Sequence, residues 1–93
     1  MLIFTLKKEW YEKIKNGKKT IEYREVKDYW SKRLYSTICF LRQGKESQCF
    51  FQLGYNPKTR ISAIISKIEI VDGINTDLKI DKKIYAIHFR IEK

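Results

Sequence analysis

A short helix that ends at a glycine and leads directly into a strand is the feature that most constrains this fold. Apolar and aromatic side chains recur at helical spacing over Lys8–Asn16, which predicts a helix. Gly17 follows, as expected for a residue that ends a helix in the left-handed conformation. Side chains then alternate between apolar and polar over Thr20–Arg24, which predicts a strand. The apolar Leu2–Leu6 precedes the helix, so the chain is expected to begin strand, helix, strand.

The rest of the chain is dominated by segments whose composition favours strands. β-Branched and aromatic residues gather in short runs between turn-forming residues. Val26–Leu34 is ambiguous, because its aromatic residues fit either a short helix or a loop. The predicted strands are Thr37–Arg42, Gln48–Leu53, Arg60–Val71 and Ile84–Ile91, with a turn at Gly54–Pro57 and a polar connection from Asn75 to Lys83.

The longest predicted strand, Arg60–Val71, changes the phase of its apolar side chains midway. Ile61 and Ile65 fall on one face, whereas Ile68 and Ile70 fall on the other. An extra residue near the centre, at Ser66, reconciles the two halves as a β-bulge. Bulges bend strands, so this strand is expected to curve.

These elements predict an α+β fold in a single domain spanning residues 1–93. Strands do not alternate regularly with helices, so a doubly wound parallel sheet is not expected. Five or six short strands, one of them bulged, predict a small, mostly antiparallel β-barrel. It carries one main N-terminal helix and a short second helix.

The charge of the chain points to an anionic partner. Twenty Lys and Arg residues stand against eleven Asp and Glu residues, a formal net charge of +9. Such an excess attracts nucleic acid through counterion release. A coding bias towards lysine explains the charge equally well. No apolar run approaches the roughly 20 residues of a membrane span, and none resembles a signal peptide, so a cytoplasmic protein without membrane contact is expected.

The soft metal ligands of the chain are few. Cys39, Cys49 and His88 are the only cysteines and the only histidine. A structural zinc site requires four closely spaced ligands, so neither a metal nor another cofactor is expected. If Thr37–Arg42 pairs with the following strand, Cys49 lies opposite Arg42 and not opposite Cys39. Two reduced thiols packed in strands are therefore predicted.

Three charged residues gather where the first helix passes into the next strand. Glu22 and Arg24 are two residues apart on that strand, so both side chains reach the same side, with Lys19 close by. An Arg held by a carboxylate beside a Lys forms a clamp for a phosphate or a carboxylate group, and Glu22 can read amino groups of a base. The alternative is an ordinary strand face exposed to solvent.

The segments Leu6–Ile14 and Gly17–Arg24 resemble the signature of the ASCH domain (activating signal cointegrator homology), which belongs to the PUA-like superfamily. Glu25–Trp30 and Ile84–His88 are similar to a subgroup of short ASCH proteins found in phages and prophages. The family motif is a helix ending in G-x-K, followed by E-x-R on the next strand. Its four fixed positions are occupied here by Gly17, Lys19, Glu22 and Arg24.

The resemblance implies a PUA-like β-barrel with a cleft beside the first helix, in which Lys19, Glu22 and Arg24 bind RNA or a nucleotide-like ligand. Some relatives are enzymes, either ribonucleases or amidohydrolases that act on an acetylated cytidine. For this chain that alternative implies Lys19 as general base or electrostatic stabiliser and Glu22 as proton carrier. The amidohydrolases carry threonine at the position of Glu22, so this chain departs from their pattern. A third interpretation is a protein-interaction module of phage origin.

Further candidates surround this cluster. Lys7 is a candidate for lining the cleft. Trp30 and the adjacent Tyr29 are candidates for stacking on a base, and one of the two is expected to pack beneath the barrel instead. Arg42 is a candidate for a basic rim. His88 can act as a general base in principle, but nothing in the sequence places a nucleophile or a carboxylate beside it. Two aromatic residues near the cluster are expected to lie in the core instead, namely Trp10 and Tyr23.

Overall fold

The computed structural model describes residues 1–76 and 78–92 of the chain. These residues form two helices and five strands, and none of the described helices is long and apolar enough to cross a membrane. The elements are β1 (Ile3–Leu6), α1 (Lys8–Lys15), β2 (Ile21–Glu25), α2 (Asp28–Arg42), β3 (Ser47–Leu53), β4 (Ile61–Asp72) and β5 (Lys83–Ile91), with single 3-10 turns at Pro57–Thr59 and Gly73–Asn75.

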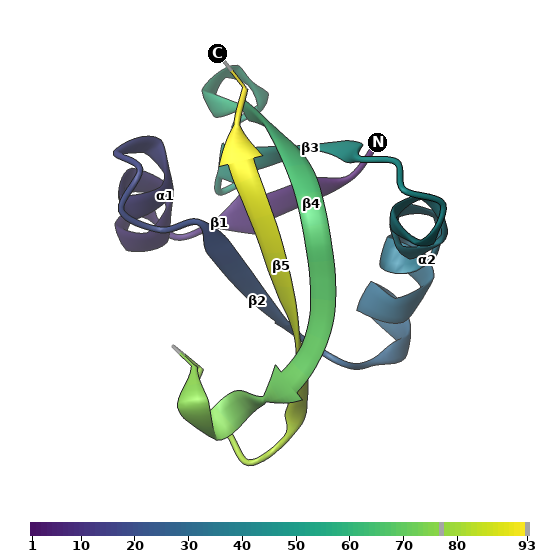
Figure 1. Cartoon of the computed structure of the whole chain (residues 1–93). Coiled ribbons are helices and arrows are strands. Elements are labelled where there is room, and N and C mark those ends of the chain that lie inside the picture. Colours follow the sequence, from purple (N-terminus) through teal and green to yellow (C-terminus); the bar gives the residue numbers. More distant parts are fainter. Residues whose placement is uncertain (77, 93) are drawn as a thin grey trace.

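The five strands form one mixed sheet in the order β1-β3-β4-β5-β2. β1 pairs with β3 in parallel, and the other neighbouring strands are antiparallel. β1 and β2 are the edge strands, so the sheet is open and the predicted closed barrel is not confirmed. The sheet curls strongly (Figure 1), and the Arg24 side chain on β2 donates a hydrogen bond across to the Thr5 carbonyl on β1, at 3.2 Å. A side chain, rather than a strand ladder, therefore joins the two edges.

The predicted beginning of the chain is confirmed. The first helix ends at Lys15, with Asn16 as its C-cap, and Gly17 adopts φ +74°, a conformation that glycine takes without a steric cost. Backbone N–H groups of Gly17 and Lys18 donate to carbonyls in the last turn of α1. The predicted strand over Thr20–Arg24 is β2, displaced by one residue.

The prediction of a strand at Thr37–Arg42 is wrong, and the second helix is not short. Most of the ambiguous segment and all of the predicted strand lie in α2, which at 15 residues is longer than α1, with 8. Trp30, Leu34 and Thr37 recur at helical spacing and are buried, and this stripe outweighs the β-propensity of the residues around it. Gly44 follows the helix end with φ +78°.

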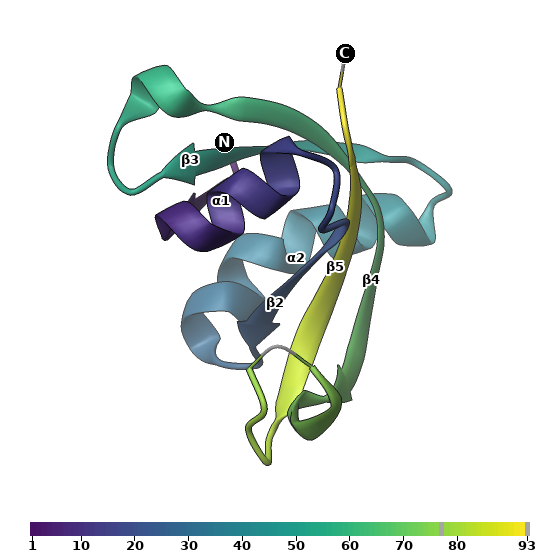
Figure 2. The ribbon, with the colours of Figure 1, turned by 90° about the vertical axis from the view of Figure 1, so that its left-hand side faces the viewer.

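The core fills the concave side of the curled sheet. Phe4 of β1 stacks on Trp30 of α2 and on Phe51 of β3, with ring centroids 5.3 and 5.4 Å apart. Viewed from the side of α1, the molecule shows α1 in front and α2 behind it (Figure 2). Fully buried side chains come from both helices and from the central strands: Ile14, Leu34, Cys49, Ile65 and Ile87.

The bulge predicted in the longest strand is confirmed. The register of β4 against β5 shifts between Ile65 and Lys67, which leaves Ser66 as the extra residue. Ile65 is buried before the shift and Ile68 packs against the core after it, so the bulge returns the apolar residues to one face. Ile70 nevertheless remains exposed.

Both cysteines are free, but they lie in different elements. Cys49 lies in β3 as predicted, whereas Cys39 lies in α2 and not in a strand. Cys49 is fully buried, and this burial raises the pKa of its thiol to about 12. Cys39 is partly exposed.

We therefore expect a single thiol to react in the native protein. At about pH 8 Ellman's reagent is expected to modify Cys39 and to leave Cys49 intact, because the buried thiol is protonated and inaccessible. In denaturant both thiols should react. A Cys39→Ser variant that still reacts rapidly under native conditions would contradict the buried position of Cys49.

Candidate functional site

A pocket of about 250 Å³ opens between the two edge strands of the sheet. The end of β1 forms one side, and α1, Lys19 and β2 form the other. The chain between β4 and β5 adds a last contact. The lining residues are Thr5, Leu6 and Lys7; Trp10; Lys19, Glu22, Tyr23 and Arg24; and Leu78.

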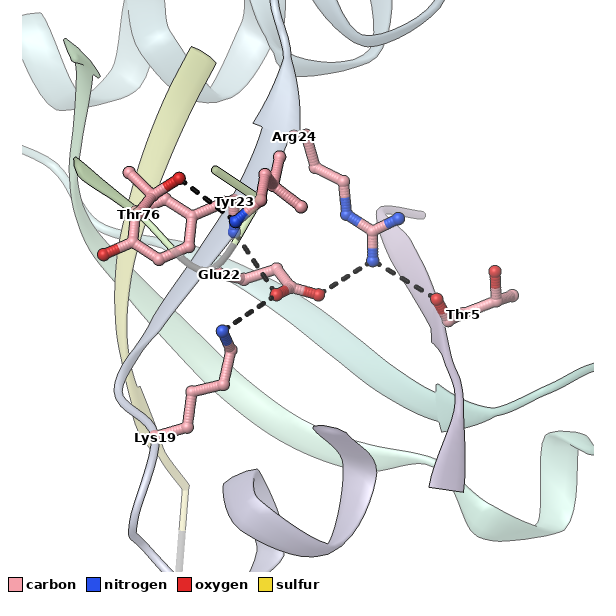
Figure 3. A network of polar contacts seen from close by, with 7 residues as sticks. Thr5, Lys19, Glu22, Tyr23, Arg24 and Thr76 are labelled. Carbon is pink, nitrogen blue, oxygen red and sulfur yellow. Dashed lines mark hydrogen bonds and ion pairs between the residues drawn. The ribbon is translucent and has the colours of Figure 1, made fainter. Parts of the chain in front are cut away.

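Glu22 is the centre of the polar network in this pocket (Figure 3). Its Oε2 accepts a hydrogen bond of 2.8 Å from Arg24 Nη2, and its Oε1 lies 3.6 Å from Lys19 Nζ. Oε1 also accepts a hydrogen bond of 3.2 Å from the Tyr23 backbone N–H. The residue is only 6% exposed, so the predicted alternative of a solvent-exposed strand face is wrong for Glu22. A buried carboxylate thus holds both cations.

Aromatic rings fix the positions of the two cations. Lys19 Nζ lies 4.8 Å from the centroid of the Trp10 ring and 5.1 Å from that of Tyr23. The Cζ atom of Arg24 lies 4.9 Å from the centroid of the Trp30 ring. The Nε atom of Arg24 is buried and has no hydrogen-bond acceptor in the part of the chain that the structure describes. Cation–π contacts of this kind favour a charged group that has lost part of its water.

Four of the predicted site residues meet in this pocket. Lys7, Lys19, Glu22 and Arg24 all line it, and the cations outnumber the carboxylate among them. The pocket is bounded by strand backbone and aromatic rings, which exclude part of the water. The positive charges therefore attract an anionic ligand in the pocket more strongly than they would in open solvent.

Two predicted residues do not reach the pocket. Trp30 is only 9% exposed and stacks on Phe4 in the core, so its ring positions Arg24 instead of offering a face to a base. Arg42 lies at the end of α2 and lines a different hollow, to which Lys67 of β4 also contributes. Tyr29, the second aromatic candidate, is half exposed, and Arg33 lies 3.5 Å from its ring centroid.

Trp10 and Tyr23 were expected to lie in the core but line the pocket. Trp10 packs against the core with part of its surface, and its ring also faces Lys19. Tyr23 points away from the Glu22 side of β2, as its position requires, yet it lies at the sheet edge and remains partly exposed. Thr5 and Leu78 carry no sequence pattern that marks them as pocket residues.

His88 has a carboxylate beside it that the sequence did not reveal. Its Nε2 is 3.7 Å from Glu69 Oε1 on the neighbouring strand, beyond hydrogen-bond distance. A hydrogen bond from Lys67 holds the pKa of Glu69 below its ordinary value, with a smaller effect from His88. Within residues 1–76 and 78–92, no three His, Cys, Asp or Glu side chains lie close enough to hold a metal ion.

No protein-family model matches the sequence, and neither a curated protein nor a solved structure matches the chain.

Proposed function

We propose that this chain is an RNA- or nucleotide-binding domain of the ASCH type, and that its ligand enters the pocket between β1 and β2. The observation that carries the proposal is the buried Glu22, which holds Lys19 and Arg24 at the wall of one pocket. The three charged residues of the motif therefore line one ligand-sized space. The strong curl of the sheet, bridged by Arg24 and Thr5, supports a PUA-like architecture with an incompletely closed barrel.

The chemistry of the pocket supports a nucleotide-like ligand in particular. Lys7, Lys19 and Arg24 offer cations to a phosphate, and Trp10 and Tyr23 offer ring surface to a base. The net charge of +9 adds long-range attraction to a polyanion. A purely electrostatic patch would need no aromatic walls and no buried carboxylate.

Binding is favoured over the two alternative functions. Both oxygens of Glu22 already contact donors, namely Lys19, the Tyr23 amide and Arg24, so its place is that of an anchor and not of a proton carrier. A hydrolase that uses Lys19 would need a second group to move the proton. A protein-interaction module would have no need for these three side chains to converge on a pocket.

Titration of fluorescently labelled single-stranded RNA tests the proposal. Affinity is expected to fall as salt rises, with a linear dependence of log K on log salt. Lys7→Ala is expected to weaken binding severalfold and to reduce the magnitude of the salt slope by about 1, because one phosphate contact is lost.

Lys8→Ala is the matched control for this test. Lys8 is the next residue, is exposed like Lys7, and does not line the pocket. It should alter affinity less, since only long-range charge is removed. Absence of RNA binding at low salt, or equal effects of the two variants, would refute the assignment of the pocket.

A further inference from the structure

A second pocket adjoins the first across a single side chain. It has a volume of about 220 Å³ and lies on the outer face of β2, β5 and β4. Tyr23 lines both pockets. The chain between β4 and β5 also reaches both, since Thr76 lines the second pocket and Leu78 the first, and the Leu78 N–H donates to Thr76 Oγ1 at 3.3 Å. Figure 3 labels Tyr23 and Thr76, which both line the second pocket.

The second pocket differs from the first in its charge. Its two carboxylates, Glu69 and Asp72, are each paired with a lysine: Lys67 Nζ lies 2.8 Å from Glu69 Oε2, and Lys83 Nζ lies 2.7 Å from Asp72 Oδ1. In the first pocket the cations outnumber the carboxylate. In the second pocket each carboxylate is paired with one lysine, so no excess of positive charge is available to a ligand. A phosphate group is therefore expected to bind more weakly here than beside Lys19.

The second pocket is instead equipped for an uncharged, hydrogen-bonding group. His88 lines it with a partly exposed imidazole, whose Nε2 is covered and faces Glu69. Asn75 and Thr76 add an amide and a hydroxyl, and Tyr23 adds an aromatic ring. A nucleoside, with its flat base and its ribose hydroxyls, offers matching donors, acceptors and ring surface.

We propose that the pocket beside His88 binds the nucleoside portion of an RNA whose phosphate is held by Lys19 and Arg24 in the first pocket. The inference rests on the proposed function and extends it: the first pocket holds a phosphate and the base that lies against Trp10, and the second pocket holds the adjoining nucleoside. Tyr23 forms the wall between them, and His88 and Asn75 supply hydrogen bonds to the nucleoside.

Comparison of RNA with inorganic polyphosphate tests this division. A short single-stranded RNA and a linear polyphosphate of matched charge are titrated against the intact protein. His88→Ala is expected to weaken RNA binding about fivefold, as for the loss of one hydrogen bond, and to leave polyphosphate binding unchanged. Asn75→Ala should act in the same direction. Lys7→Ala should weaken both ligands.

The controls separate the two proposals. Gln43→Ala, at an exposed position that lines neither pocket, should change neither affinity, and circular dichroism verifies that each variant is folded. If RNA binds and Lys7→Ala weakens it while His88→Ala and Asn75→Ala leave it unchanged, the second pocket is not a nucleoside site although the proposed function stands. Equal loss of RNA and polyphosphate affinity in His88→Ala also overturns the inference. Failure of the wild-type protein to bind RNA removes both proposals.

Discussion

Replacement of Glu22 by alanine is expected to lower the free energy of unfolding by about 3–5 kcal/mol, as found when one partner of a buried ion pair is removed. The Glu22 side chain is 8% exposed and contacts two cations, Lys19 and Arg24, whose side chains are 9% and 20% exposed. Without Glu22 the two positive groups face each other in a poorly hydrated pocket. Urea denaturation followed by circular dichroism measures the loss.

Two further variants separate charge from packing. Glu22→Gln keeps the shape of the side chain and a carbonyl acceptor for Arg24, so it is expected to cost less than Glu22→Ala. Glu25→Ala removes a carboxylate from the same strand at a more exposed position and should change stability by less than about 1 kcal/mol. If Glu22→Ala and Glu25→Ala destabilise the protein equally, Glu22 is not the anchor of a buried network.

The first quarter of the fold is predictable because its signals are local. The apolar stripe of α1, the left-handed Gly17 and the alternation over β2 each depend on residues within a few positions of one another. The bulge at Ser66 was predictable for the same reason, since one extra residue is enough to shift the apolar side chains of a single strand from one face to the other.

The sequence predicted less well where two local signals compete. Residues 37–42 contain β-branched and aromatic side chains that favour a strand, yet they continue the helical stripe that begins at Trp30. Gly44 is compatible with a hairpin turn and with a helix end alike. Packing of the stripe against β1, through Trp30 and Phe4, decides between them, and that contact joins residues far apart in the chain.

The sequence predicted which side of the strand the charged side chains of the candidate site occupy, but not how deeply they are buried. The two-residue spacing of Glu22 and Arg24 placed both on one side of β2, and the structure confirms that they meet. The burial of Glu22 depends on elements that no local pattern links to it, namely the end of β1, α1 and Leu78. For the same reason Trp10 and Tyr23 could not be recognised as pocket walls.

Leu34→Ala is expected to destabilise the protein by about 2–5 kcal/mol, through lost burial and the cavity left behind. Leu34 is fully buried at the centre of the α2 stripe, and Leu41 packs against the same core two turns later. The loss is measured as a shift in the urea unfolding midpoint.

Tyr35→Ala is the matched control, because Tyr35 is the next residue of the same helix and is 69% exposed. Its removal should change stability by less than about 0.5 kcal/mol. A second pair tests the helical phase itself: Ile38 packs against the core, whereas Phe40 is 43% exposed, although a strand would place both on one face. Ile38→Ala should therefore cost more than Phe40→Ala. Equal losses in this pair would argue for the strand that the local propensities favour, and against the packed helix that holds Trp30 under Arg24.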